Sequence, residues 1–281
     1  MLVTLKEVLN DARKNKYAVG LFNTVNLEMA RGVIEAAEET NSPVIIGTAE
    51  ILLPYGPLEE LSWLLKPMAK KAKVPVVLHF DHGLTYELVI KALRLGFSSV
   101  MYDCSTLSYE ENIKNCRDMA LITKSFGASL EAELGHVGAN EGGSAEGAED
   151  SSIYTEPMQA KEFFEATGVD ALAVAIGTAH GIYKSKPKLD IQRLKEISLT
   201  ADVPLVLHGG SGLSDHDFRS CIANGISKVN IFTDINIAAA EAAGKANSTN
   251  SGITDLIPGI VENIKQATIE KMKLFGCFNR G

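Results

Sequence analysis

The stretch VPVVLHFDHG, residues 74–83, combines the two features that decide the fold. Its apolar part, Val76–Phe80, is a short run rich in β-branched residues, which is typical of a buried strand. Its last part turns abruptly polar with Asp81 and His82 and then ends in Gly83. An apolar strand followed at once by ionisable residues is typical of a parallel sheet whose carboxyl edge carries a functional site.

Similar apolar runs occur on both sides of this one, separated by amphipathic stretches long enough for helices. The eight expected strands are Tyr17–Phe22, Val44–Thr48, Val76–Phe80, Ser98–Tyr102, Ser129–Glu133, Ala171–Ile176, Leu205–His208 and Lys228–Ile231. The expected helices are Leu27–Glu39, Leu58–Lys71, Tyr86–Leu95, Tyr109–Phe126, Met158–Ala166, Ile191–Ser198, Asp215–Ala223, an alanine-rich helix from Ile235 and a last one within Val261–Leu274. This alternation predicts an α/β fold, a (β/α)8 TIM barrel that spans residues 1–281 as a single domain. No GxGxxG motif follows the first strand, so a dinucleotide-binding sheet is not favoured.

Two stretches between these elements differ from the barrel framework. Residues His136–Glu156 are rich in glycine, serine and acidic residues, and they far exceed the usual βα loop of about two to six residues. We expect them to form a long, mobile, functional loop after the fifth strand. Lys245–Pro258 is polar, and we expect a solvated surface connection there before the last helix.

Composition excludes several classes of protein. The chain has 281 residues and a formal net charge of −8, which argues against a nucleic-acid-binding protein. Its apolar stretches are too short or too interrupted by charge to span a bilayer, and its first residues do not resemble a signal peptide. We therefore expect a cytoplasmic protein without a nucleic-acid or membrane partner. The cysteines form no CxxC pair, which predicts free thiols, and they are Cys104, Cys116, Cys221 and Cys277.

Polar residues gather where the predicted strands end, and a barrel of this kind carries its active site there. His82 follows the third strand, His180 follows the sixth, and His208 ends the seventh. Three neutral imidazoles with an open fourth position form a common catalytic zinc site, so we predict that these histidines bind Zn²⁺ or a similar divalent ion. Asp103 and Glu133, at the ends of the fourth and fifth strands, could orient the histidines or offer an alternative metal position.

The adjacent pair Asp81 and His82 places a condition on the third strand. Neighbouring residues of a regular strand point to opposite faces, so both side chains can enter one site only if the strand stops there. Gly83 directly afterwards supports such a stop. His79 shares the strand parity of Asp81 and becomes a candidate hydrogen-bond partner behind the ligands. The two histidines that we expect in loops or on the surface are His136 and His216.

Glycines after the seventh strand carry a second signal. The run Gly209-Gly210-Ser211-Gly212 and the residues Asn230–Thr233 after the eighth strand lie where barrels commonly bind phosphate through backbone N–H groups. A divalent metal beside a phosphate pocket can polarise a carbonyl while Asp81 shuttles a proton, which suits carbon–carbon bond cleavage next to a ketone. The rival strategy uses a Schiff-base lysine, but no predicted strand ends in lysine, and Lys228 falls at the start of its strand.

Several motifs together resemble the class II ketose-bisphosphate aldolases, in the branch of the fructose- and tagatose-bisphosphate enzymes. The motifs are HFDHG at 79–83, EAELG at 131–135, AVAIGTAHGIYK at 173–184, LHGGSG at 207–212, KVNIFTD at 228–234 and FNR at 278–280. The resemblance runs essentially from end to end of the chain. It implies a zinc-dependent lyase that reversibly cleaves a ketose 1,6-bisphosphate to dihydroxyacetone phosphate and an aldehyde such as glyceraldehyde 3-phosphate.

The resemblance also implies roles for individual residues. His82, His180 and His208 would bind the catalytic zinc, and Asp103 and Glu133 match acidic residues near a secondary metal position. Asp81 would donate and accept the proton at the C4 hydroxyl of the substrate. The positions that match the dihydroxyacetone phosphate pocket are Gly181, Lys184, Gly209, Gly210, Ser211, Asn230, Ile231, Phe232 and Thr233.

Further expectations follow from the same resemblance. Glu141, in the long loop, matches a glutamate that the family places over the site during enediolate formation. A monovalent cation, Na⁺ or K⁺, and assembly as a homodimer or homotetramer are common in the family. The chain departs from the family pattern at Ala139–Gly143, at Phe232 and at Thr48–Tyr55, which leaves open the group at the far end of the sugar. Arg280 is a candidate partner for an anionic group there.

Two other functions remain compatible with these residues. A metal-dependent sugar-phosphate isomerase or epimerase could use the same barrel, because an enediolate can be reprotonated instead of attacking an aldehyde. A sugar-phosphate-binding protein without catalysis could also have kept the scaffold. The complete histidine set and Asp81 favour the aldolase over both.

Overall fold

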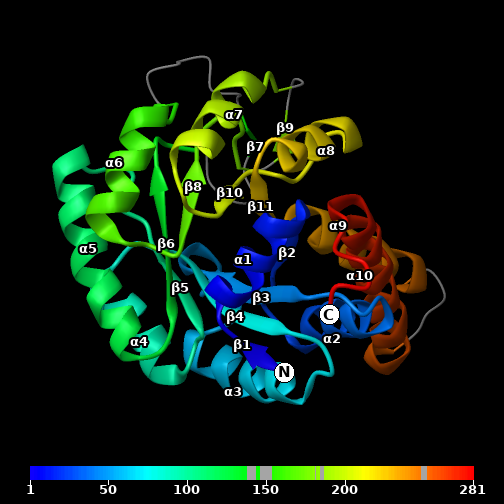
Figure 1. Cartoon of the computed structure of the whole chain (residues 1–281). Helices are drawn as coiled ribbons and strands as arrows, with labels where there is room; N and C mark the ends of the chain where they lie inside the picture. The colour runs from blue at the N-terminus through cyan, green and yellow to red at the C-terminus, as the bar shows by residue number, and fades with distance from the viewer. Residues whose placement is uncertain (138–143, 146–153, 181, 184–186, 248–251) are drawn as a thin grey trace.

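The computed structural model describes residues 1–137, 144–145, 154–180, 182–183, 187–247 and 252–281. Eight parallel strands form a closed barrel, and helices surround it (Figure 1). The predicted (β/α)8 barrel is therefore confirmed. Within it, the positions of Glu141, Gly181 and Lys184 lie outside the described residues, as does most of the predicted loop His136–Glu156.

The barrel strands are β2 (Val19–Asn23), β3 (Val44–Ala49), β4 (Val76–Gly83), β5 (Ser99–Tyr102), β6 (Ser129–Leu134), β8 (Ala171–Val174), β10 (Leu205–Leu207) and β11 (Ile226–Ile231). The helices that follow them are α2 (Leu27–Glu39), α3 (Leu58–Lys71), α4 (Tyr86–Leu95), α5 (Tyr109–Ser125), α6 (Pro157–Thr167), α7 (Ile191–Thr200), α8 (Asp215–Ala223), α9 (Thr233–Asn247) and α10 (Ile253–Phe275). The remaining elements are β1 (Leu2–Val3), α1 (Leu5–Asn15), the 3₁₀ turn η1 (Glu50–Leu52), β7 (Ser144–Ala145) and β9 (Ile182–Tyr183).

The strands pair in the order in which they occur along the chain. β2 pairs with β3, the order continues through β4, β5, β6, β8 and β10 to β11, and β11 pairs back to β2 through Lys228 and Val19. Because every pair is parallel, the carboxyl ends of all eight strands meet at one mouth of the barrel. That mouth collects the strand-end side chains that the sequence analysis singled out.

Helix α1, which the sequence analysis did not predict, covers the opposite mouth. Thr4 accepts a hydrogen bond from the backbone N–H of Glu7, and the Glu7 side chain binds back to Thr4 in a capping box that begins the helix. Its buried face, which includes Leu5 and Leu9, contacts β2, β4, β6, β8 and β11. The amino-terminal end of the barrel is thus closed by apolar packing.

The connection before the last helix is more helical than predicted. We expected Lys245–Pro258 to be a surface loop, but α9 continues to Asn247 and α10 already begins at Ile253. Pro258 removes a backbone donor in the second turn of α10 and does not end the helix. Tertiary packing outweighs this local cost, because α10 lies against α2 and Ile264 is completely buried.

All four cysteines are free and buried. None of the described helices combines the length and the apolar character that a membrane-crossing segment needs.

Candidate active site

The end of β4 brings two neighbouring side chains into one site by a local distortion of the strand. We expected the strand to stop after Phe80, but it continues to Gly83 with a register shift against β5 between these two residues. His82 has a positive φ of 43°, a conformation rare for a side-chain-bearing residue, and this breaks the alternation that would send Asp81 and His82 to opposite faces. A Cβ at Gly83 would lie only 2.5 Å from Val89, so the packing after the distortion requires glycine.

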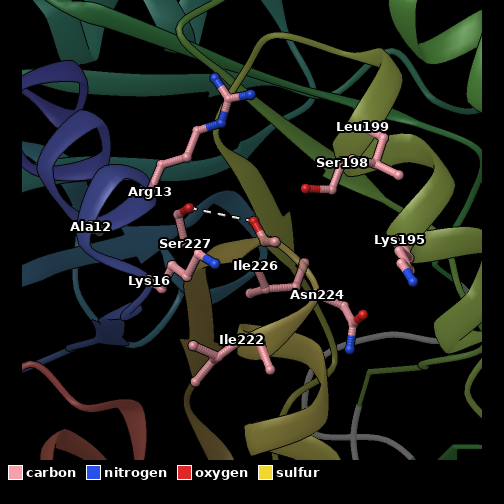
Figure 2. A pocket seen from close by; sticks show the side chains of 12 residues that line it. Ala12, Arg13, Lys16, Lys195, Ser198, Leu199, Ile222, Asn224, Ile226 and Ser227 are labelled. Atoms are coloured by element: carbon pink, nitrogen blue, oxygen red, sulfur yellow. Dashed lines mark hydrogen bonds between the residues drawn. The ribbon is translucent and has the colours of Figure 1, made fainter.

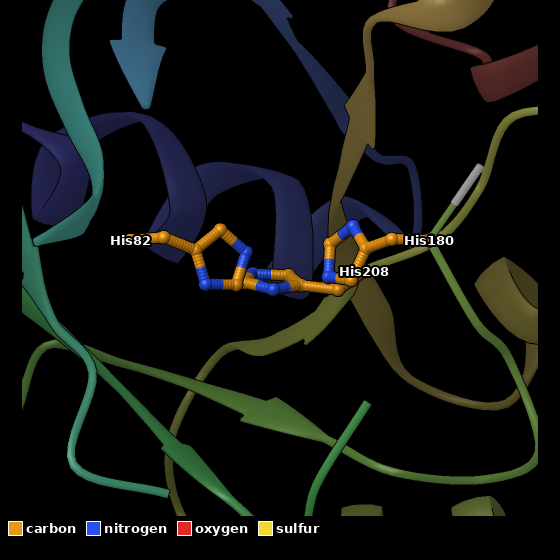
Figure 3. Close-up of side chains that lie close together, drawn as sticks. All are labelled: His82, His180 and His208. Atoms are coloured by element: carbon orange, nitrogen blue, oxygen red, sulfur yellow. The ribbon is translucent and has the colours of Figure 1, made fainter. Parts of the chain in front are cut away.

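The three histidines meet over the carboxyl mouth of the barrel. His82 lies near the end of β4, His180 follows β8 and His208 follows β10, and Figure 3 shows their rings directed toward one another. One nitrogen from each ring lies within 4.8 Å of those of the other two, a group that could hold a metal ion. β8 and β10 are neighbours in the sheet, but β5 and β6 separate β4 from β8, so the curvature of the closed barrel brings the His82 ring to the other two.

Hydrogen bonds to acidic residues fix two of the rings. His82 Nδ1 lies 2.9 Å from Asp103 Oδ2, and His208 Nε2 lies 2.9 Å from Glu131 Oε1. The other nitrogens, His82 Nε2 and His208 Nδ1, are buried and have no hydrogen-bond partner among the described residues. A buried polar atom without a partner is costly, and a metal ion bound by these nitrogens would remove that cost. The donor set of three imidazoles therefore fits a zinc ion.

The electrostatics of the site are dominated by these imidazoles and their acidic neighbours. Burial lowers the pKa of His82, but the Asp81 carboxylate and the hydrogen bond with Asp103 outweigh it and raise the pKa to about 10. Burial and the positive charge of His82 lower the pKa of His180 well below its usual value. The metal-free site thus holds a proton on His82, which a metal ion has to displace because only the deprotonated nitrogen is a ligand.

Asp81 is completely buried and is held by two asparagine amides. Asn23 Nδ2 donates to Asp81 Oδ2 over 2.9 Å, and Asn230 Nδ2 lies 3.1 and 3.0 Å from the two carboxylate oxygens. Burial raises the pKa of Asp81, but the charge of His82 and the hydrogen bond with His79 hold it well below its usual range. Asp81 is therefore an ionised carboxylate in fixed orientation, next to the histidine group. Neither asparagine partnership was predicted.

The two acidic residues predicted near the metal lie beside the histidines. Asp103 accepts hydrogen bonds from His82 and from the backbone N–H of Ser105, while Glu133 Oε2 lies 3.3 Å from His208 Nδ1. His82, Asp103 and Glu133 also form a second group whose ligand atoms lie within 4.8 Å of one another. The arrangement is compatible with both predicted roles, orientation of the histidines and an alternative metal position.

Glu131 and Lys228 form a buried ion pair that the sequence analysis did not assign to the site. Lys228 Nζ lies 2.9 and 2.8 Å from the two oxygens of Glu131, and both side chains are fully buried. Lys228 lies within β11, which begins two residues earlier than predicted, at Ile226. Burial raises the pKa of Glu131, but Lys228 and His208 outweigh it and lower the pKa to about 2. The signal was available, since a charge inside an apolar strand requires a partner of opposite sign.

Residues of the predicted phosphate pocket line one small hollow next to His180. Its other lining residues are Gly209, Gly210, Ser211, Asn230, Phe232 and Thr233. Ile231 does not line the hollow, because its side chain is completely buried in the hydrophobic core. The Ser211 hydroxyl lies 3.5 Å from the backbone nitrogen of Phe232, so the loops after β10 and β11 are in contact.

Three predictions about outlying residues can be compared with the structure. Arg280 lies with its guanidinium 5.5 Å from the ring centre of Tyr17, which precedes β2 at the amino-terminal mouth. Arg280 therefore does not line the site of its own chain. Its neighbours Asn279 and Gly281 donate backbone hydrogen bonds to the turn that ends α2, which holds this segment at that mouth. His136 and His216 are exposed, with 45% and 90% of their side chains accessible, as expected.

A separate open hollow of about 370 Å³ lies at the amino-terminal end of the barrel (Figure 2). It lies between α1, α7 and the start of β11, and its basic residues include Lys16 and Lys195. Arg13 on its rim is already paired with Asp202 over 2.7 Å. No histidine or carboxylate is among the described residues that line it, so its size does not make it a candidate for the chemistry.

Comparisons with known proteins identify the family of this chain. A model of the family described as fructose-bisphosphate aldolase class-II matches residues 3–280. The chain is 42% identical over 276 residues to the uncharacterized protein YdjI of Escherichia coli K12, covering 98% of each, and 37% identical to a fructose-bisphosphate aldolase of Staphylococcus aureus, covering 99% of each. The crystal structure of the YdjI aldolase from Escherichia coli K12 superposes with a TM-score of 0.89 at 38% identity, covering 100% of this chain and 99% of that one. The chain therefore belongs to the class II fructose-bisphosphate aldolase family.

Proposed function

We propose that this aldolase cleaves a ketose 1,6-bisphosphate, or a close analogue with another group at C6, to dihydroxyacetone phosphate and an aldehyde. The proposal rests on one arrangement of side chains. Asp81 is ionised, is held by the amides of two asparagines, and lies beside three imidazoles. Two of these imidazoles direct a nitrogen without a hydrogen-bond partner among the described residues toward the same group of candidate metal-ligand atoms. His82, His180 and His208 would hold zinc there. A zinc ion so bound would act as a Lewis acid that polarises the substrate ketone and stabilises the enediolate.

The protein's own residues would carry the proton transfers. In the cleavage direction Asp81 accepts the proton of the C4 hydroxyl, and the C3–C4 bond breaks. The electron pair of that bond stays with the three-carbon enediolate, and C4 becomes the carbonyl carbon of the aldehyde. The amides of Asn23 and Asn230 hold the carboxylate in place for this transfer. Glu141, as the family resemblance implies, would protonate the enediolate carbon and so complete dihydroxyacetone phosphate.

The phosphate of that fragment would bind at the glycine loop. Gly209 and Gly210 present backbone without side chains beside His180, and a Cβ at Gly209 would lie 2.4 Å from the Ala179 carbonyl oxygen. Ser211 and Thr233 add hydroxyl groups to the same hollow. Gly181 and Lys184 would complete the pocket by the resemblance. A phosphate bound there would place the adjacent ketone toward the histidines, since His180 lines the same hollow.

For the far end of the substrate, we propose a broader range of chemical groups at C6. Arg280 lies at the opposite mouth, so it does not supply a cation for a second phosphate in its own chain. Phe232 lines the hollow beside Thr233, at a position where the family resemblance implies a smaller or polar residue. We therefore include analogues of fructose and tagatose 1,6-bisphosphate that carry no phosphate at C6.

A cleavage assay over a substrate panel tests the proposal. Fructose and tagatose 1,6-bisphosphates and their 1-phosphates would be offered to zinc-loaded protein, with dihydroxyacetone phosphate measured by a coupled reductase. We expect release that is lost in strong chelator and restored by added zinc. Full activity of metal-free protein would contradict the zinc centre, and a product that keeps all the substrate's carbons would identify an isomerase or epimerase instead.

We further propose a homodimer or homotetramer and activation by Na⁺ or K⁺, as the family resemblance implies. Light scattering after size-exclusion chromatography measures the mass of the assembly directly. Activity in potassium, sodium and tetramethylammonium buffers at equal ionic strength tests the monovalent cation. A monomeric, fully active protein in tetramethylammonium would contradict both expectations.

A further inference from the structure

The ion pair between Lys228 and Glu131 crosses the interior of the barrel. β11 and β6 are separated in the sheet by β10 and β8, so these side chains can meet only through the barrel's centre. Lys228 Nζ lies 2.9 Å from Glu131 Oε1 and 2.8 Å from Oε2, and neither side chain is accessible to solvent. A buried ammonium is normally paired with a group of opposite charge, and here its partner is the carboxylate of Glu131, which also has a second role.

That second role is a hydrogen bond to His208, one of the proposed metal ligands. Glu131 Oε1, the oxygen that Lys228 contacts, also lies 2.9 Å from His208 Nε2. A carboxylate only accepts hydrogen bonds, so Nε2 carries the hydrogen and the lone pair of the neutral ring lies on Nδ1. His208 Nδ1 is buried and has no hydrogen-bond partner of good geometry among the described residues, and the nearest acidic oxygen, Glu133 Oε2, lies 3.3 Å away. The chain Lys228–Glu131–His208 thus ends at the atom that would bind zinc.

Glu131 has an alternative position available if the ammonium is removed. Its Oε2 lies 3.9 Å from His79 Nε2, a buried nitrogen that also lies 3.6 Å from Asp81 Oδ1. Lys228 contacts both carboxylate oxygens and so opposes a rotation of the carboxylate toward His79. Without Lys228, nothing else among the described contacts of Glu131 balances the attraction of His79 against that of His208.

We propose that Lys228 is a positioning residue for the metal centre, acting through Glu131 on the orientation and the tautomer of His208. The inference rests on the proposed zinc site. Lys228 does not touch the metal or the substrate, and its nitrogen is engaged by Glu131, so it has no role as a Schiff-base nucleophile. Partners behind metal ligands typically change metal affinity by about 10- to 100-fold, and Lys228 belongs to that class although it lies one residue further away.

The test is zinc affinity, measured on metal-free protein by competition with a chromogenic chelator. We expect Lys228→Met to raise the dissociation constant for zinc about 10- to 100-fold. The matched control is Lys265→Met, which removes a lysine that pairs with Glu39 between helices and contacts none of the histidines. We expect the control to bind zinc within about twofold of the wild type. The visible spectrum of cobalt(II)-loaded protein should change in Lys228→Met and not in the control, because it reports ligand geometry.

A double variant separates positioning from folding. Lys228→Met leaves Glu131 as an unpaired buried charge and can destabilise the barrel, whereas Glu131→Leu combined with Lys228→Met replaces the whole pair by apolar groups of similar size. We expect the double variant to unfold at a temperature near that of the wild type but to keep the weakened zinc affinity. Zinc binding within about threefold of the wild type in either folded variant, with an unchanged cobalt spectrum, would overturn the inference. A wild-type protein that binds no zinc would instead overturn the proposed metal centre, and the inference with it.

Discussion

Replacement of Asp81 by alanine should abolish carbon–carbon bond cleavage while it leaves zinc binding intact. The carboxylate is fully buried and makes three contacts of 2.9 to 3.1 Å with the amides of Asn23 and Asn230, so its position is fixed. It is ionised at neutral pH, because burial raises its pKa but the charges of His82, Lys228 and His208 and the hydrogen bond with His79 together outweigh burial. Alanine removes the base and leaves the imidazoles and their acidic partners in place.

The size of the effect follows from what one positioned base contributes. General acid–base groups typically provide about 10²- to 10⁴-fold in rate, which corresponds to about 3 to 5 kcal/mol in the activation free energy. The loss should appear in kcat and in kcat/KM alike, because Asp81 acts on the C4 hydroxyl in the transition state. The two asparagine amides lose an acceptor, which costs about 1 to 3 kcal/mol of folding stability and is partly offset by removal of a buried charge.

Two assays separate the proposed roles of Asp81 from those of the metal and Glu141. The first is the coupled release of dihydroxyacetone phosphate from the substrate. The second is exchange of a C–H proton of dihydroxyacetone phosphate with deuterated water, observed by NMR, which needs enediolate formation but no proton transfer at C4. Asp81→Ala should lose cleavage and retain exchange, and Glu141→Gln should lose both. Asp202→Ala, at a side chain that is 91% exposed and paired with Arg13, serves as the control.

The role of Asp81 would be refuted by a folded, zinc-loaded Asp81→Ala protein whose kcat/KM stays within about threefold of the wild type. Loss of exchange in parallel with cleavage would also count against it, because the base would then act before or during enediolate formation. A loss of bound zinc in this variant would show that the carboxylate contributes to the metal site itself.

Three further predictions use contacts in and below the site. Gly209→Ala should weaken zinc binding, because φ is +63° and the new Cβ would lie 2.4 Å from the carbonyl oxygen of Ala179, the residue before His180; unchanged affinity in a chelator competition would contradict this. Gly47→Ala should destabilise the fold by more than about 2 kcal/mol, because its Cβ would lie 2.0 Å from the carbonyl oxygen of His79 on β4; urea denaturation measures the difference. Zinc binding at pH 7 should release a proton from His82, because the pKa of this residue is about 10 in the metal-free site. The apparent affinity for zinc should therefore rise as the pH rises toward 10 and fall as the pH is lowered. Titration with zinc in a weakly buffered dye solution counts the released protons.

Most of the barrel framework was predictable because each unit is local in sequence. The order of strand and helix along the chain, the apolar runs and the strand-end histidines all follow from residues within a few positions of one another. Predictions failed where distant packing overrode local preference, as at Pro258 inside α10 and at the start of the chain, where α1 closes the barrel. The strand end near Gly83 that lets Asp81 and His82 enter one site was expected, but the positive φ of His82 that produces it was not.

Strand periodicity by itself determined which residues share a face of their strand. His79 and Asp81 share one face of β4, and Lys228 and Asn230 share one face of β11. Only the closed barrel decided that Lys228 contacts Glu131 and that Asn230 contacts Asp81. It also decided that Arg280 lies at the opposite mouth, away from both carboxylates. The physical reason is that these partners lie on strands that do not pair, so their distances depend on the curvature and closure of the whole sheet.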